Sequence, residues 1–357
     1  MADTINNDAA LMSWLRMAIA RAFAGAQPSD LTALKGDASG RRFWRVALTA
    51  LPTAAAAPPA TAIVVDLGPE DLPLYARALE LVPTPLVEPP WLTLQRFFSA
   101  INVAVPQVYF ADCATRRLLV EDVGELPLFD AAARGDAADL FRLAVDQLIL
   151  IHGRGTAELP PDALPARIAY DERLFRWELE QFLEFGLSAL RPGADKAALG
   201  AELDYLAARL GRLPRVLSHR DYHGHNLFVQ FRSGEPRIRV IDFQDALMAP
   251  AAQDLAVLLT TRDTSRLLTP RIEQRVLDYY YGAQVRRQAA TMSYDDFVES
   301  YRLCVLQHAL KVIGRFLYLE GEGRRGYVQY IPYALGQARR ILRERADFRA
   351  LRAALGD

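Results

Sequence analysis

The first third of the chain alternates short apolar runs with turns, whereas the remainder repeats apolar residues at helical spacing. Residues 8–24 place apolar side chains every third or fourth position, which predicts an amphipathic helix. Short runs bounded by Gly, Pro and Ser are typical of strands. Such runs lie at 34–46, which predicts a hairpin, and at 62–67, 106–110 and 117–120, with helices expected at about 70–81 and 91–98.

From about residue 126 the pattern is mostly helical. Apolar stripes predict helices at 137–152, 170–187, 198–211, 270–288 and 295–318. Residues 216–245 interrupt them with two short strands, 227–230 and 238–241, separated by a Ser-Gly turn. We therefore expect an α+β fold of two lobes, with a small β-rich N-lobe at 1–122 and a larger, mainly helical C-lobe at 123–357.

Composition narrows the class of protein. The chain has 357 residues, is 51% hydrophobic and carries a net charge of −1, which attracts neither nucleic acid nor an anionic membrane. No apolar run approaches the roughly 20 residues that span a bilayer, and Met1 to Asp8 lack the features of a signal peptide. Two cysteines, Cys113 and Cys304, suggest neither a disulfide framework nor a zinc site. The expectation is a cytoplasmic protein, a monomer, acting on a small molecule.

The segment from Ser218 to Asn226 carries the chemistry. It places Asp221 five residues before Asn226, and Asp242 follows sixteen residues later at the end of a β-branched strand. This order is typical of phosphoryl transfer, in which one acid accepts a hydroxyl proton while an amide and a second acid hold Mg²⁺ against the phosphates of ATP. We therefore predict Asp221 as the catalytic acceptor of the proton, Asn226 and Asp242 as metal ligands, and Asp245 as a secondary metal or substrate contact.

The other polar residues of this segment leave alternatives open. His219 and Arg220 are expected to brace the loop, and His223 either braces it or contacts the substrate. Asp, Asn and Gly are also ordinary turn residues, so the segment could be only a polar turn before a hairpin. Three oxygen donors, two strands and a preceding glycine turn together favour the phosphoryl-transfer interpretation.

A second candidate element is the small-residue turn of the first hairpin. Its backbone can approach a phosphate closely, and arginines that follow it can pair with phosphate oxygens. The predicted nucleotide-binding residues here are Gly36, Ala38, Ser39, Gly40, Arg41 and Arg42.

The loop His219-Arg220-Asp221 with Asn226, together with Ile241-Asp242-Phe243, resembles the catalytic and metal-binding loops of the aminoglycoside phosphotransferases and choline kinases. These enzymes share the two-lobed fold of protein kinases. Asp254, within 249–256, matches the acid that in this family braces the catalytic loop. The resemblance extends from about residue 30 to residue 330 and implies a kinase that uses ATP and Mg²⁺.

Four shorter stretches are similar to one bacterial branch of this family, the anomeric kinases of cell-wall recycling that act on N-acetylmuramate and N-acetylglucosamine. They are 36–43, 119–124, 170–172 and 242–246. The similarity implies an amino-sugar acceptor, a sugar 1-phosphate product and adenine held near Glu121 and Val123. It also implies substrate contacts from Asp171 and Glu172, beside His223 and Asp245.

One departure from kinases of this fold concerns the third strand, which usually carries a lysine that reaches the phosphates. Here the strand offers Asp66, and there is no lysine between residues 36 and 195. We expect another cation to substitute, with Lys35, Arg41, Arg42 and Arg45 as candidates, and an acid at this position also matches the anomeric-kinase branch. The alternatives are a phosphotransferase acting on an aminoglycoside or amino alcohol, and a catalytically inert nucleotide-binding protein.

Overall fold

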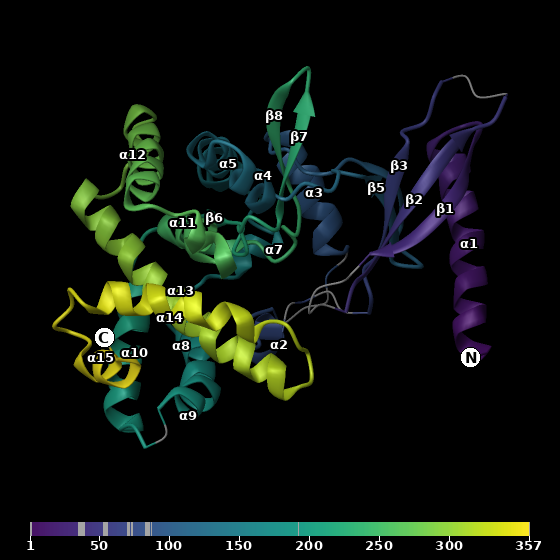
Figure 1. The fold of residues 1–357 in the computed structure, drawn as a ribbon. Helices are drawn as coiled ribbons and strands as arrows, with labels where there is room; N and C mark the ends of the chain where they lie inside the picture. Colours follow the sequence, from purple (N-terminus) through teal and green to yellow (C-terminus); the bar gives the residue numbers. More distant parts are fainter. Residues whose placement is uncertain are drawn as a thin grey trace.

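The computed structural model describes residues 2–34, 40–52, 56–69, 72, 74–82, 86, 88–191 and 193–356. A twisted sheet with one long helix stands at one side of the molecule, and a larger group of helices forms the other side (Figure 1). Among the described residues, no helix is both long and apolar enough to cross a bilayer.

The sheet contains five antiparallel strands in the order β1-β2-β3-β5-β4. Their bounds are Ala26–Leu34 (β1), Arg42–Ala50 (β2), Thr61–Asp66 (β3), Val108–Asp112 (β4) and Arg117–Glu121 (β5). The predicted hairpin and the three further strands are confirmed, but residues 35–39 at the hairpin tip lie outside the described part of the chain.

Alternation along β3 sends side chains to two different cores. Val64 packs with helix α1 (Ala2–Ala22), whose Leu15 and Ile19 are fully buried against the sheet. Val65, on the opposite face, belongs to the larger core that continues into the helical part. The sheet is therefore fixed on one face by the opening helix, as the apolar pattern at 8–24 predicted.

Two helices connect β3 to β4. The first, α2, covers Leu74–Ala78; residues 70, 71 and 73 of the helix predicted at about 70–81 lie outside the described part of the chain, and residues 79–81 are not helical. Glu80 adopts a left-handed φ of 51°, which a continuing α-helix cannot contain. The second, α3 (Pro90–Ala100), matches its prediction and buries Trp91 and Phe98.

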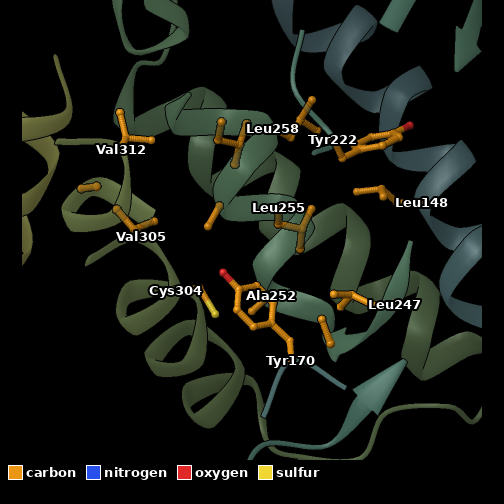
Figure 2. Packing of buried hydrophobic residues seen from close by; sticks show 14 of the residues in the cluster. Leu148, Tyr170, Tyr222, Leu247, Ala252, Leu255, Leu258, Cys304, Val305 and Val312 are labelled. Atoms are coloured by element: carbon orange, nitrogen blue, oxygen red, sulfur yellow. The ribbon is translucent and has the colours of Figure 1, made fainter. Parts of the chain in front are cut away.

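The remaining α-helices of the described residues all follow β5. They are α4 (Leu128–Arg134), α5 (Ala137–Leu150), α6 (Thr156–Glu158), α7 (Leu164–Arg167), α8 (Glu172–Gln181), α9 (Leu187–Leu190), α10 (Lys196–Gly211), α11 (Ala251–Thr260), α12 (Pro270–Arg286), α13 (Tyr294–Gly321), α14 (Ile331–Leu342) and α15 (Arg349–Leu355). Five of them, α5, α8, α10, α12 and α13, confirm the predicted stripes. In the core, α11 is buried from Ala252 onward between Tyr170, Leu148 and α13 (Figure 2).

The long stretch predicted at 170–187 is not one regular helix. Five residues from Phe182 to Gly186 form a π turn between α8 and α9. This turn lies where α13 crosses α8 at Gly314, whose position leaves no room for a side chain. A Cβ at Gly314 would lie 2.5 Å from the carbonyl carbon of Gln181 and 2.5 Å from the nitrogen of Phe182. Local irregularity at the π turn thus accompanies an unusually close helix crossing.

Four short strands surround the motif of the sequence analysis. A hairpin of β7 (Leu227–Arg232) and β8 (Glu235–Val240) confirms the predicted pair, and its turn residues Ser233 and Gly234 both have positive φ. The second ladder, β6 (Arg215–Ser218) with β9 (Leu247–Pro250), was not predicted. Each of its strands is four residues long, and the loops between them hide the pairing from any local pattern.

We predict that Gly314→Ala lowers the free energy of unfolding by about 2–3 kcal/mol, because the added methyl group must push α13 away from α8. Denaturant unfolding measures this change. Gly321→Ala, on the last residue of the same helix, has no atom within 4 Å of the added Cβ. We expect Gly321→Ala to leave the free energy of unfolding unchanged or to raise it slightly. Equal stability of both variants would contradict the close crossing.

Candidate functional site

Two loops meet between the two small ladders. The first runs from the end of β6 to the start of β7, and the second from the end of β8 to the start of β9. Ser218 pairs with Leu247 at one end, and Leu227 pairs with Val240 at the other. The β6–β9 ladder holds one end of both loops together, and the β7–β8 ladder holds the other end. The two loops therefore lie side by side, and their side chains come into contact.

Hydrogen bonds also join the two loops directly. The backbone N–H of Ile241 donates to the carbonyl of Asn226 (3.0 Å), and the Nε2 of His219 lies 3.0 Å from the carbonyl oxygen of Ile241. His219 is fully buried. Its predicted role as a brace of the loop is consistent with these contacts.

Asp254, on α11, holds the start of the first loop. Its carboxylate accepts the backbone N–H groups of His219 (2.8 Å) and Arg220 (2.9 Å), and it lies 3.0 Å from the Nε2 of His152. Arg220 has a φ of 77°, so these contacts stabilise a strained backbone. Burial opposes ionisation of Asp254, but the contacts with His152 and His219 lower its pKa from the ordinary value.

The three predicted oxygen donors come together at this point. The side-chain amide of Asn226 donates to the backbone carbonyl of Asp221 (3.0 Å) and to the Asp242 carboxylate (3.2 Å). Gln244 donates to the other oxygen of Asp242 (2.9 Å). Asp242 has a φ of 62°, a left-handed conformation that its loop imposes. Asp221 and Asn226 of the first loop therefore form one cluster with Asp242 of the second loop.

Charge around Asp221 favours its ionised form. Burial alone would raise its pKa, but Arg220, 3.6 Å away, and Lys311 of α13 hold the pKa well below the ordinary value. The Arg220 guanidinium lies 3.2 Å from Glu178 and 4.1 Å from the ring centroid of Tyr75. Asp221 is thus a carboxylate throughout the physiological pH range.

His223 is buried beside this cluster. Its Nε2 lies 3.4 Å from the side-chain nitrogen of Asn226, and its Nδ1 has no hydrogen-bond partner among the described residues. Burial, with the nearby positive charge of Arg262, lowers its pKa well below the ordinary value. The imidazole is therefore neutral, and its Nδ1 is buried without a hydrogen-bond partner among the described residues.

The arginines after the hairpin tip separate in the structure. Arg41 lies 3.1 Å from Asp242 and 3.7 Å from Asp245, so it joins the sheet to the second loop. Arg42 pairs instead with Asp66 on β3 (2.7 Å), and Arg45 pairs with Asp122 (2.6 Å). Of the three, Arg41 is the one in contact with the predicted metal ligand. Gly36, Ala38 and Ser39 lie outside the described residues, while Gly40 has open space at its Cα.

Asp66 lies on the third strand, where the resemblance to kinases predicts a lysine. Arg42 and Arg117 (3.7 Å) face its carboxylate, which also accepts the N–H of Gly68 (3.0 Å). The negative charge of Asp66 is therefore compensated by Arg42 and Arg117 of the neighbouring strands.

Asp245 is partly buried on the second loop, next to Arg41. Burial raises its pKa, although the positive charges of Arg41 and Arg220 oppose the change. Its backbone carbonyl accepts the hydroxyl of Tyr75 (3.3 Å). The Asp245 side chain therefore belongs to the same polar cluster as Asp242.

The predicted adenine region lies at the end of β5. The Glu121 carboxylate accepts two hydrogen bonds from Arg239 of β8 (2.6 and 2.8 Å), and Arg239 also donates to the carbonyl of Val105 (2.9 Å). The Glu121 side chain therefore ties the sheet to the small hairpin, and the Glu121 backbone N–H donates to the carbonyl of Gln107 (2.8 Å). Val123 is buried two residues further on.

The acids at the start of α8 have other contacts. Asp171 caps the helix by accepting the N–H of Leu174 (3.0 Å), and Glu172 is exposed. The acid of this helix that reaches the catalytic loop is Glu178, which the sequence analysis did not select as a site residue. It stands in the apolar stripe with Leu174 and Phe175, and a charged residue in such a stripe is the signal that could have found it.

Comparisons with known proteins agree with this geometry. Residues 30–290 match the family model described as the phosphotransferase enzyme family. An N-acetylmuramate/N-acetylglucosamine kinase of Pseudomonas aeruginosa is 29% identical over 248 residues, which are 68% of this chain and 70% of that protein. A kinase of the same name from Neisseria meningitidis serogroup B is 27% identical over 341 residues, 91% of this chain and 90% of that protein.

Solved structures show the same fold at low sequence identity. The choline kinase of Streptococcus pneumoniae gives a TM-score of 0.58 at 14% identity and covers 96% of this chain and 99% of that chain. An ADP-bound aminoglycoside phosphotransferase gives a TM-score of 0.51 at 14% identity, and the match covers 87% of this chain and 93% of that chain. The predicted α+β fold, with the two-lobed architecture of protein kinases, is confirmed.

The fold and the matched segments define a kinase that transfers a phosphoryl group from a nucleotide to a hydroxyl group of a small molecule. The chain belongs to the phosphotransferase enzyme family. The prediction of an ATP-dependent phosphotransferase is thereby confirmed.

We predict that Asp254→Asn lowers the free energy of unfolding by about 2–4 kcal/mol, because a buried carboxylate with three partners is replaced by an amide. It should also reduce kcat at least tenfold, since the first loop loses its support. Asp139→Asn, exposed on α5, is the control and should change neither value. A wild-type kcat in Asp254→Asn would show that Asp254 does not position the loop.

Proposed function

We propose that this protein is an ATP- and Mg²⁺-dependent kinase of an amino sugar, which phosphorylates the anomeric hydroxyl of N-acetylmuramate or N-acetylglucosamine for cell-wall recycling. The observation that carries the proposal is the cluster of Asp221, Asn226 and Asp242 between the two small ladders. The names of the curated relatives support the choice of acceptor.

In this proposal Asp221 accepts a hydrogen bond from the acceptor hydroxyl and takes its proton as the new P–O bond forms, while the bond between the γ-phosphorus and the bridging oxygen breaks and ADP leaves. Its low pKa makes it a weak base, which suits a loose transition state in which the proton leaves late. The main contribution of Asp221 is then to orient the hydroxyl oxygen toward the phosphorus atom. Asp254 and Arg220 hold the loop that carries it.

Asn226 and Asp242 fit a magnesium ion. Their side chains are in contact, Asp242 is partly exposed, and both offer the oxygen atoms that Mg²⁺ prefers. Among the described residues, no group of three or more His, Cys, Asp or Glu side chains could hold a metal, which suits an ion that is held by two side chains and by nucleotide phosphates. When bound, Mg²⁺ would neutralise phosphate charge.

Arg41 is the cation that we assign to the phosphates in place of the third-strand lysine. Its contacts with Asp242 and Asp245 put a guanidinium next to the proposed metal ligands. A guanidinium pairs well with phosphate oxygens, so the nucleotide would take over Arg41 from these acids. This assignment favours an active enzyme over an inert nucleotide-binding protein.

The other assignments complete the proposal. The N-lobe, residues 1–122, supplies the glycine turn and the backbone near Glu121, while Val123 begins the C-lobe, which extends to residue 357 and binds the acceptor. His223 is a candidate contact for the acceptor because its Nδ1 has no hydrogen-bond partner among the described residues. Asp171 and Glu172 remain predictions as substrate contacts. We also propose that the enzyme works as a cytoplasmic monomer.

The environment of Asp221 argues against a cationic acceptor. The positive charge of Lys311 helps to lower the pKa of Asp221, and Arg220 lies between Asp221 and Glu178. An aminoglycoside or an amino alcohol would bring further positive charge to these cations. A neutral or anionic sugar avoids that cost.

The activity test is ADP release with ATP, Mg²⁺ and a panel of sugars, amino alcohols and aminoglycosides. We expect turnover with N-acetylmuramate or N-acetylglucosamine and a product that has lost its reducing end, as a 1-phosphate must. A product that still reduces copper would be phosphorylated on another hydroxyl. Turnover of the amines alone would refute the amino-sugar acceptor.

We predict that Asp221→Ala reduces kcat by about 10²–10⁴-fold while nucleotide affinity stays within threefold of wild type, because Asp221 acts on the acceptor rather than on ATP. Single-turnover kinetics and nucleotide titration measure the two effects. Loss of nucleotide binding in a folded variant would contradict the assigned role.

We predict that Arg41→Ala raises the KM for ATP about tenfold or more, since it removes a charged contact to the phosphates. The matched control is Arg42→Ala, because the guanidinium of Arg42 is paired with Asp66 instead. This variant should change the KM for ATP less than threefold. A lower KM or a lower Mg²⁺ requirement in Arg41→Ala would instead show that Arg41 only competes with the metal for Asp242.

A further inference from the structure

A group of positive charges faces the catalytic loop from α13. Lys311 lies 3.0 Å from the same oxygen of Glu178 that Arg220 approaches to 3.2 Å. Arg315 follows Lys311 by four residues, so the two side chains lie on the same face of the helix. The proposed function uses neither Lys311 nor Arg315 for catalysis.

The charges of this group do not balance. Arg220, Lys311 and Arg315 are three cations, and the carboxylates among them are Glu178 and Asp221. Both carboxylates already face Arg220, and Glu178 also faces Lys311. Among the described residues, Arg315 is thus the one cation of the three that forms no ion pair with either carboxylate.

Arg315 is held in unfavourable surroundings. Among the described residues no carboxylate lies within 4.0 Å of its guanidinium, which instead lies 5.3 Å from the ring centroid of Tyr318. Burial lowers the pKa of Arg315 from the ordinary value, and the positive charges of Arg324 and Arg220 add to this effect, while Tyr318 and Glu178 oppose it. A partly buried guanidinium beside other cations is stabilised when an anion binds to it.

We propose that Arg315, with Lys311 beside it, binds a carboxylate group of the acceptor, so that the enzyme prefers N-acetylmuramate, which carries a lactyl carboxylate, to the neutral N-acetylglucosamine. The inference rests on the proposed function and specifies its substrate. Arg315 acts on specificity: the acceptor hydroxyl lies at Asp221 while the carboxylate of the same sugar meets α13.

Binding through a carboxylate has a kinetic consequence. A charge-assisted pair formed away from the reacting atoms holds the substrate equally in the ground and transition states, so it acts on KM more than on kcat. The preference for N-acetylmuramate should thus appear mainly as a lower KM. It should weaken at high ionic strength, since Arg315 is partly exposed.

The test compares three acceptors in steady-state kinetics: N-acetylmuramate, its methyl ester and N-acetylglucosamine. The ester keeps the bulk of the lactyl group but removes its charge. We expect Arg315→Gln to lower kcat/KM for N-acetylmuramate about 10–100-fold, mostly through KM, and to change the other two acceptors less than threefold. Arg315→Lys should recover part of the loss.

Arg302→Gln is the matched control, because Arg302 lies on the same helix, is half exposed and faces Glu344 at 3.8 Å. It should behave like wild type with all three acceptors. Lys311→Gln should resemble Arg315→Gln in its selectivity, with an additional loss of stability since Glu178 loses a partner.

The outcomes separate the two proposals. Turnover of N-acetylglucosamine with equal losses for all acceptors in Arg315→Gln would overturn the carboxylate site and leave the sugar kinase intact. A rise in the KM for ATP in Arg315→Gln would assign the arginine to the nucleotide instead and also overturn the inference. No turnover of either sugar by the wild type would overturn both proposals.

Discussion

The buried carboxylate of Asp254 is the contact on which the rest of the site depends. It accepts two successive backbone N–H groups, from His219 and Arg220, at the point where the chain takes a left-handed turn. Without an acceptor these buried donors would be costly, and the turn would relax. The turn directs Arg220 toward Glu178 and brings Asp221 to the start of the loop, so an acid on one helix sets the geometry of another segment.

A second carboxylate, Glu178, connects this loop to α13. One of its oxygens receives both Arg220 and Lys311, while the other accepts hydrogen bonds from Tyr170 and Gln307. Two helices and the catalytic loop therefore share one buried anion. Such a fully bonded network leaves little freedom in the position of Asp221.

The sequence was sufficient for the features that depend on local spacing. Asp221, Asn226 and Asp242 could be selected because their positions follow one loop and one hairpin, and the long helices because their apolar stripes repeat. The ladder of β6 and β9 could not, since its strands are four residues long and pair across the site. Glu178 and Lys311 were missed because their contact joins helices far apart in the chain. Nor does any local pattern distinguish Arg41 from Arg42.

The close crossing of α13 and α8 affects the distance between Lys311 on α13 and Glu178 on α8. Gly314 stands between Lys311 and Arg315 on α13, and the backbone that it touches begins three residues after Glu178. The spacing of two helix backbones thus sets how far the cations of one helix stand from the anion of the other. Substrate preference in this enzyme could therefore be altered by residues that never meet a substrate, through the distance between two helix axes.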